Sequence, residues 1–176
     1  MENTKKQKIN VSSKTKLLVS SALFAALICI SINFFHIPIG ANGGFIHIGD
    51  AFIYLAAVLL PTPYAAFSAA IGSGMADITM GAANWVLATI IIKPILVLFF
   101  TSKSKKIINL RNVCASIIAG IVGTVLYMIA DGIMLGSFES AFILSFVGLI
   151  QPIGSFIVFI VIGLVFDKLK IKEMVK

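Results

Sequence analysis

Residues 17–35 read LLVSSALFAALICISINFF, an apolar run without a single charged side chain, and five lysines stand just before it in residues 5–16. A bilayer core about 30 Å thick needs about 20 helical residues to cross it, so the run is long enough to span a membrane. Basic flanks stay on the cytoplasmic side of such a helix. No small-residue cleavage motif closes the run, so we expect an uncleaved membrane helix rather than a signal peptide.

The same alternation of basic and apolar segments continues along the chain. Of the 14 Lys and Arg residues, all but Lys93 fall in residues 5–16, 103–111 or 168–176. Hydrophobic residues make up 59% of the sequence and charged residues only 12%, which excludes an ordinary soluble domain. The net charge of +7 is explained by topology rather than by nucleic-acid binding, because the basic residues stand at span boundaries and not on an aromatic and basic face.

The apolar runs predict an all-α membrane protein with six transmembrane helices in one bundle. These runs cover residues 17–35, 48–60, 64–80, 85–101, 113–135 and 142–166. Because the three basic segments then lie on one side, we expect both termini in the cytoplasm. The predicted organisation is a basic cytoplasmic segment, the transmembrane domain and a basic cytoplasmic tail, at residues 1–16, 17–166 and 167–176.

Acidic residues collect near the outward ends of the predicted spans: Asp50, Asp77, Asp131 and Glu139. An ionisable group inside a bilayer costs at least about 2.5 kcal/mol, so each of these is either paired or exposed to a water-filled cavity. Asp50, Asp131 and Glu139 could instead cap a helix or lie in a hydrated loop at the membrane–water interface. Asp77 and Lys93 lie deeper in their spans.

Lys93 shares one helix face with Thr89 and Trp85, each one turn earlier, and is followed by Pro94, which weakens the local helical hydrogen bonding. An aromatic ring, a hydroxyl and an ammonium that face one space could bind a small polar aromatic ligand. The alternative is structural, with Trp85 as an interfacial anchor and Lys93 paired to Asp77.

Signatures of catalysis and of metal binding are missing. The sequence contains no Gly-x-x-x-x-Gly-Lys phosphate cradle, no His-Glu-x-x-His and no Gly-x-Ser-x-Gly, so we expect neither an enzyme nor a bound cofactor. His47 and Asp50 stand one helical turn apart and His36 could add a third ligand, which is too few for a closed metal site.

Small residues at four-residue spacing predict close helix packing. In the first run, Ala22 and Ala26 form one such pair, and Ser21 and Ala25 form a second. The third run also carries little side-chain volume at four small residues: Gly72, Ser73, Gly74 and Ala76.

The sequence resembles the substrate-binding S component of an energy-coupling factor (ECF) vitamin transporter. The resemblance rests on the Ala-x-x-x-Ala pair, on HIGDAFIYLAAVLL from His47, on AAIGSGMAD ending at Asp77, and on the segment from Trp85 to Lys93-Pro94. It covers about residues 16–167, and within the family it is most similar to the branch with hydroxymethylpyrimidine, pyridoxine and riboflavin-type members.

The resemblance implies a subunit in the plasma membrane of a prokaryote that binds a vitamin or precursor from outside. It would then join a transmembrane T component and two cytoplasmic ATPases, with Ala22 and Ala26 as the surface against the T component. The outward polar cluster would form the pocket, and the loop after the first span its lid. The candidate ligand-binding residues are Asp50, Asp77, Asn84, Trp85, Thr89, Lys93, Asp131 and Gln151.

Two other classes stay open at the level of sequence. A stand-alone carrier could couple transport to protons through Asp77 and Lys93, although such carriers are often built from internal repeats and none is visible here. A membrane enzyme or a scaffold subunit is disfavoured because no catalytic constellation is present.

Overall fold

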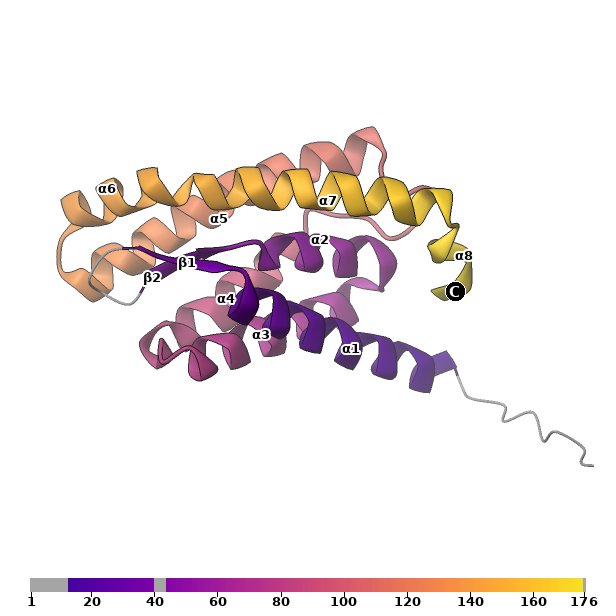
Figure 1. Ribbon diagram of the computed structural model, residues 1–176, viewed down its shortest axis with the longest axis horizontal. Coiled ribbons are helices and arrows are strands. Elements are labelled where there is room, and N and C mark those ends of the chain that lie inside the picture. Colours follow the sequence, from indigo (N-terminus) through magenta and orange to yellow (C-terminus); the bar gives the residue numbers. More distant parts are fainter. Residues whose placement is uncertain (1–12, 40–43, 176) are drawn as a thin grey trace, which may run out of the picture.

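The protein is described by a computed structural model over residues 13–39 and 44–175, so most of the predicted cytoplasmic segment 1–16 lies outside the described residues. The described chain is helical apart from one short β-hairpin (Figure 1). Its elements are α1 (Ser13–Phe34), β1 (His36–Ile39), β2 (Gly44–His47), α2 (Gly49–Leu59), α3 (Thr62–Thr79), the 3-10 helix η1 (Ala83–Trp85), α4 (Val86–Val97), α5 (Leu110–Leu135), α6 (Phe138–Gly148), α7 (Ile150–Lys168) and α8 (Ile171–Val175).

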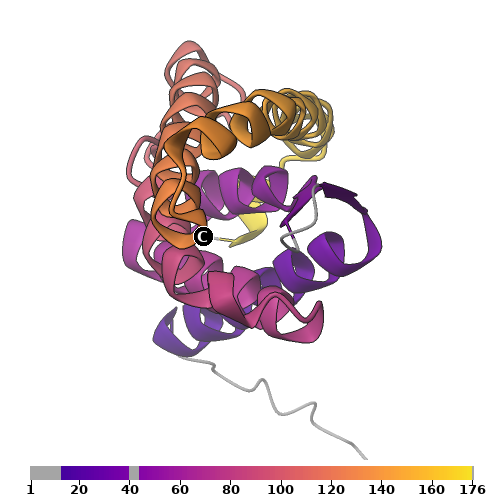
Figure 2. The ribbon, with the colours of Figure 1, turned by 90° about the vertical axis from the view of Figure 1, so that its left-hand side faces the viewer.

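The helices form two layers with α2 between them (Figures 1 and 2). Helices α1, α3 and α4 make one layer, and α5, α6 and α7 make the other. Every residue of α2 except Phe52 is buried, which explains why its sequence carries no polar stripe. With 11 residues, α2 is about 16 Å long and is enclosed by protein rather than by lipid.

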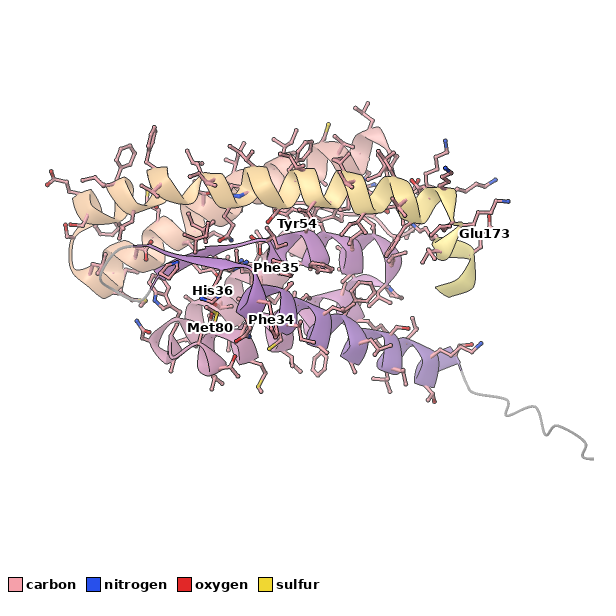
Figure 3. The ribbon with its side chains drawn as sticks, viewed as in Figure 1. Phe34, Phe35, His36, Tyr54, Met80 and Glu173 are labelled. Atoms are coloured by element: carbon pink, nitrogen blue, oxygen red, sulfur yellow. The ribbon has the colours of Figure 1, made fainter. Side chains whose placement is uncertain are left out.

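Aromatic side chains tie α2 to both layers. The Tyr54 ring lies near the middle of the bundle (Figure 3). It stacks on Phe100, just after α4, with ring centroids 4.9 Å apart, and meets the edge of Phe159 of α7 at 5.8 Å. Such offset and edge contacts add to the apolar burial that holds the layers together.

Helices α1 and α3 pack closely through small residues, as the sequence predicts. The Ser21 hydroxyl bonds the Ser68 hydroxyl at 2.8 Å and donates to the Tyr64 carbonyl at 2.9 Å. A Cβ atom placed on Gly72 would stand 2.5 Å from the Ala25 carbonyl oxygen. The pair Ser21 and Ala25 therefore faces inward, whereas Ala22 and Ala26 are exposed on the outer face of α1.

The described parts of the three basic segments lie at one end of the molecule. The start of α1, the segment between α4 and α5, and α8 with Glu173 share the right-hand end of the view (Figures 1 and 3). Asp167, near the end of α7, accepts hydrogen bonds from the backbone N–H groups of Ile107 and Ile108, at 2.7 and 2.9 Å. The hairpin and the turn between α5 and α6 lie at the opposite end (Figure 1).

Three helical stretches of the described chain are long and apolar enough to cross a membrane. They are Ser13–Phe34, Leu110–Leu135 and the α6–α7 stretch Phe138–Lys168. The last is not one straight helix, because the chain bends where α6 meets α7 (Figure 2). Two of the predicted spans, 48–60 and 85–101, correspond to the shorter apolar helices Gly49–Leu59 and Ala83–Val97. Each of these helices has fewer than the about 20 residues that a full bilayer crossing needs.

Candidate functional site

A cavity of about 130 Å³ lies among α2, α3, α4, α5 and the α6–α7 bend, next to strand β2. Its polar lining includes seven of the eight sequence-predicted ligand-binding residues: Asp50, Asp77, Trp85, Thr89, Lys93, Asp131 and Gln151. The eighth, Asn84, is exposed and does not line this cavity. The lining is completed on the apolar side by Ile46, Leu96, Ala119, Leu144 and Pro152.

A buried ion pair lies in the wall of the cavity. The Lys93 ammonium donates to the Asp50 carboxylate across 2.5 Å, and the two side chains are 2% and 7% exposed. This corrects the structural alternative drawn from the sequence, in which Asp77 pairs with Lys93. Asp50 takes that position because α2 lies between the layers, directly beside α4, so the first turn of α2 faces the middle of α4.

Gln151 joins this pair to the hairpin. Its side-chain amide donates to the second Asp50 oxygen at 2.8 Å and accepts from the backbone N–H of His47 at 3.3 Å. A single side chain at the start of α7 thus connects α2 and β2. Gly148 and Pro152, on either side of the junction between α6 and α7, also line the cavity, so this junction brings Gln151 to it.

His47 closes the cavity from the hairpin. It is buried, and its Nδ1 accepts from the backbone N–H of Gly49 at 3.0 Å. Burial and, secondarily, the positive charge of Lys93 lower the pKa of His47 to about 3, so its ring is neutral at pH 7. Within the described ranges, no group of three or more His, Cys, Asp or Glu side chains is arranged to hold a metal ion.

The predicted stripe runs from the end of η1 along α4 and faces the cavity. Trp85, Thr89 and Lys93 all line it, and each meets Tyr127 of α5. The Thr89 hydroxyl bonds the Tyr127 hydroxyl at 3.0 Å, the Trp85 and Tyr127 ring centroids are 6.3 Å apart, and the Lys93 ammonium lies 5.0 Å from the Tyr127 ring centre. The ammonium over the ring is a cation–π contact, which further stabilises the buried charge.

Of the α5 face that lines the cavity, only Asp131 was predicted from the sequence. Its members stand three or four residues apart and therefore share one side of the helix: Gly120, Gly123, Thr124, Tyr127 and Asp131. This spacing could have revealed the face from the sequence, because steps of three or four residues back from Asp131 reach Tyr127, Thr124 or Gly123, and Gly120. Gly120 leaves room for a neighbouring side chain, since a Cβ there would stand 2.7 Å from the Pro152 Cβ.

Comparison with known proteins assigns the family. A family model described as "ECF-type riboflavin transporter, S component" matches residues 12–170. The chain is also 40% identical over 57 residues to an "Uncharacterized protein in gap 3'region" of Pyrococcus woesei, a match that covers 32% of this chain and 38% of that relative. No solved structure matches the chain. The family match extends from the first turn of α1 to the end of α7, so it includes every residue of the cavity. The chain therefore belongs to the family of membrane-embedded S components of ECF-type riboflavin transporters.

Proposed function

We propose that this chain captures a small vitamin or vitamin precursor from outside a prokaryotic cell, as the substrate-binding subunit of an ECF transporter in the plasma membrane. The observation that carries the proposal is the cavity, which combines buried polar groups with two aromatic rings. It is lined in part by strand β2, whose hairpin lies at the end of the bundle away from the basic segments (Figure 1). Ligand pockets commonly have such mixed walls, in which a few polar groups orient the ligand.

Within this function the residues of the cavity divide into two groups. Asp77, Trp85, Thr89 and Asp131 present side chains to the ligand. Asp50, Lys93 and Gln151 hold one another and the hairpin in place, and so shape the wall that the ligand meets. Asn84 is left out of the proposed set because it is exposed outside the cavity.

A titration of the purified subunit in detergent tests the proposal. The probes are riboflavin, which the family description names, together with pyridoxine and hydroxymethylpyrimidine. We expect saturable binding of one of these at one site per chain, measured by calorimetry and, for riboflavin, by quenching of its fluorescence. If none of the three bound, this ligand class would be wrong. If the subunit alone carried a solute into liposomes, it would be a stand-alone carrier instead.

We further propose six membrane spans with both termini in the cytoplasm. In this arrangement α2 and α4 are counted as spans although each is shorter than a full bilayer crossing, and α2 is enclosed by the other helices. The basic segments share one side. With Cys29 and Cys114 replaced by alanine, a cysteine at Ser104 should react with a membrane-impermeant thiol reagent only in opened cells. A cysteine at exposed Glu139 should react in intact cells. Labelling of both positions from outside would contradict this topology.

For assembly we propose that the outer face of α1 contacts a T component, which carries two ATPase subunits. Ala22 and Ala26 are exposed one turn apart there, which allows close helix approach. Changing both to leucine should leave ligand binding intact, because leucine is equally apolar, but should lower co-purification with the T component severalfold. The matched control is Cys114→Leu, an exposed small side chain on α5. Equal co-purification of the double variant and the control would rule out this surface.

A further inference from the structure

A second hollow, of about 260 Å³, adjoins the cavity. It is lined by Asn84 and Trp85 on one side and by Met134 and Leu135 on the other. Trp85 also lines the cavity, and it is the one described residue that belongs to both spaces. Its side chain therefore lies in the partition between them, and with only 7% of its surface exposed it keeps the two apart.

The second hollow lies at the end of the bundle away from the basic segments. Met134 and Leu135 belong to the last turn of α5, next to the turn into α6 that lies at that end (Figure 1). Both are exposed, and so is Asn84. Asp131, one helical turn before Leu135 on the same side of α5, lines the cavity. A path through the second hollow and past Trp85 thus leads from the protein surface into the cavity.

Among the described residues, no hydrogen bond holds the Trp85 side chain in the partition, because its indole Nε1 has no partner. Its ring meets the Tyr127 ring at 6.3 Å between centroids, with the two planes tilted by 45°. The backbone beneath it is fixed, since the Trp85 N–H donates to the Ala82 carbonyl at 2.9 Å and the Ala82 N–H donates to the Asp77 carbonyl at 2.8 Å. The ring can therefore turn aside without breaking any hydrogen bond described here.

The hairpin wall of the cavity is held more firmly. The backbone N–H of His47 donates to the Gln151 side chain at 3.3 Å, and both Ile46 and His47 are buried. Lifting this wall to admit a ligand would break that bond and expose two buried side chains. Of the two walls, the one at Trp85 opens at the lower cost.

We propose that a ligand enters and leaves the cavity through the second hollow, between η1 and the last turn of α5, and that the Trp85 side chain is the gate. Asn84 then supplies a polar group at the entrance, opposite the apolar Met134 and Leu135. No described residue of this lining carries a charge, which suits an uncharged solute. The inference rests on the proposed binding function and adds a route to it. The route differs from the lid that the family resemblance implies at the loop after the first span.

The first test blocks the hollow and leaves the cavity untouched. In a chain with Cys29 and Cys114 replaced by alanine, Asn84→Cys is modified with methyl or benzyl methanethiosulfonate, which attach a small or a bulky group. Rapid mixing then gives the association and dissociation rates of riboflavin, or of pyridoxine or hydroxymethylpyrimidine where one of these is the probe that binds. The benzyl group should slow both rates by about tenfold relative to the methyl group. The Kd should stay nearly the same, because a blocked path raises the barrier and changes neither end state.

Two matched positions carry the same benzyl group. Glu139→Cys is exposed at the same end of the bundle and lines neither hollow, so the benzyl group should leave both rates unchanged there. Ile37→Cys is exposed on the hairpin and tests entry at that wall. Slowing at Ile37→Cys together with unchanged rates at Asn84→Cys would place the entrance at the hairpin and overturn the proposal.

The second test removes the gate. Trp85→Ala should raise the association rate constant about tenfold, because the path is then open in every molecule. Equilibrium binding weakens as well, since a side chain that faces the ligand is lost. A residue that only contacts the bound ligand would raise the dissociation rate and leave association unchanged, so an association rate at or below the wild-type value would show that Trp85 is not a gate. If this variant does not fold, the adducts at Asn84→Cys decide alone.

The outcomes separate the route from the function on which it rests. If a probe binds but the benzyl group at Asn84→Cys leaves both rates unchanged, or weakens the Kd without slowing association, the proposed entrance is wrong and the binding function stands. If none of the three probes binds the unmodified subunit, the binding function fails and the route fails with it.

Discussion

Methionine in place of Lys93 should lower the free energy of unfolding by about 3–5 kcal/mol, the range for removing one member of a buried ion pair. The substitution keeps the length and the apolar stem of the side chain, so the loss comes from Asp50, whose buried carboxyl group would be left without its positively charged partner. Asp50 would retain the hydrogen bond from Gln151, which offsets part of the cost. Thermal unfolding of the purified subunit in detergent measures the effect.

A second substitution identifies the partner. Because the structure pairs Lys93 with Asp50, the double variant Asp50→Asn, Lys93→Met should recover most of the lost stability. The matched double variant Asp77→Asn, Lys93→Met should not, since Asp77 is not the ion-pair partner. Recovery in the Asp77 variant alone would mean that the pairing described above is wrong.

Alanine in place of Gly72 should destabilise the protein by about 1–3 kcal/mol, the usual cost of overfilling a well-packed interior. The added Cβ would stand 2.5 Å from the Ala25 carbonyl oxygen and 2.9 Å from the Ile28 Cβ. Neither can move freely, because both belong to the body of α1. The helices must therefore separate, which also strains the hydrogen bonds between Ser21 and Ser68.

The matched control is Gly154→Ala in α7, where an added Cβ meets nothing within 4 Å. This variant should be as stable as the wild type or up to about 1 kcal/mol more stable, because alanine favours helix over glycine. Denaturation followed by the loss of helical circular dichroism compares the two variants. Equal stability of Gly72→Ala and Gly154→Ala would show that α1 and α3 do not pack as described.

The sequence predicts well those features that depend on charge and on long apolar runs. The predicted fifth span, 113–135, differs from α5 (Leu110–Leu135) by three residues at one end. The hairpin was missed because its strands have only four residues each, too short for alternation to stand out in a Gly-rich link. Apolar content alone also could not show that the run at 48–60 is a short helix buried inside protein.

For the candidate site, too, the sequence predicts what depends on local spacing but not what depends on how distant helices pack. Local spacing was enough to place Trp85, Thr89 and Lys93 together, since one helix face carries all three. The partner of Lys93 could not be found this way, because Asp50 is 43 residues away in sequence and the depth of its side chain depends on where α2 lies between the layers. The identity of the family was also accessible from sequence, as the match over residues 12–170 confirms, whereas the pyridoxine or hydroxymethylpyrimidine branch stays a prediction.

The position of Gln151 has a consequence for how the protein is made. Its two partners, Asp50 and the backbone of His47, precede it by 101 and 104 residues. Chains fold from the amino terminus as they are synthesised, at about 5–20 residues per second. Asp50 and the hairpin are therefore synthesised seconds before Gln151, whose side chain bridges them. Ribosome-bound chains that stop before α7 would contain both residues of the buried ion pair but not Gln151. The binding site is therefore completed only when α7 has been synthesised and has packed against α2 and the hairpin.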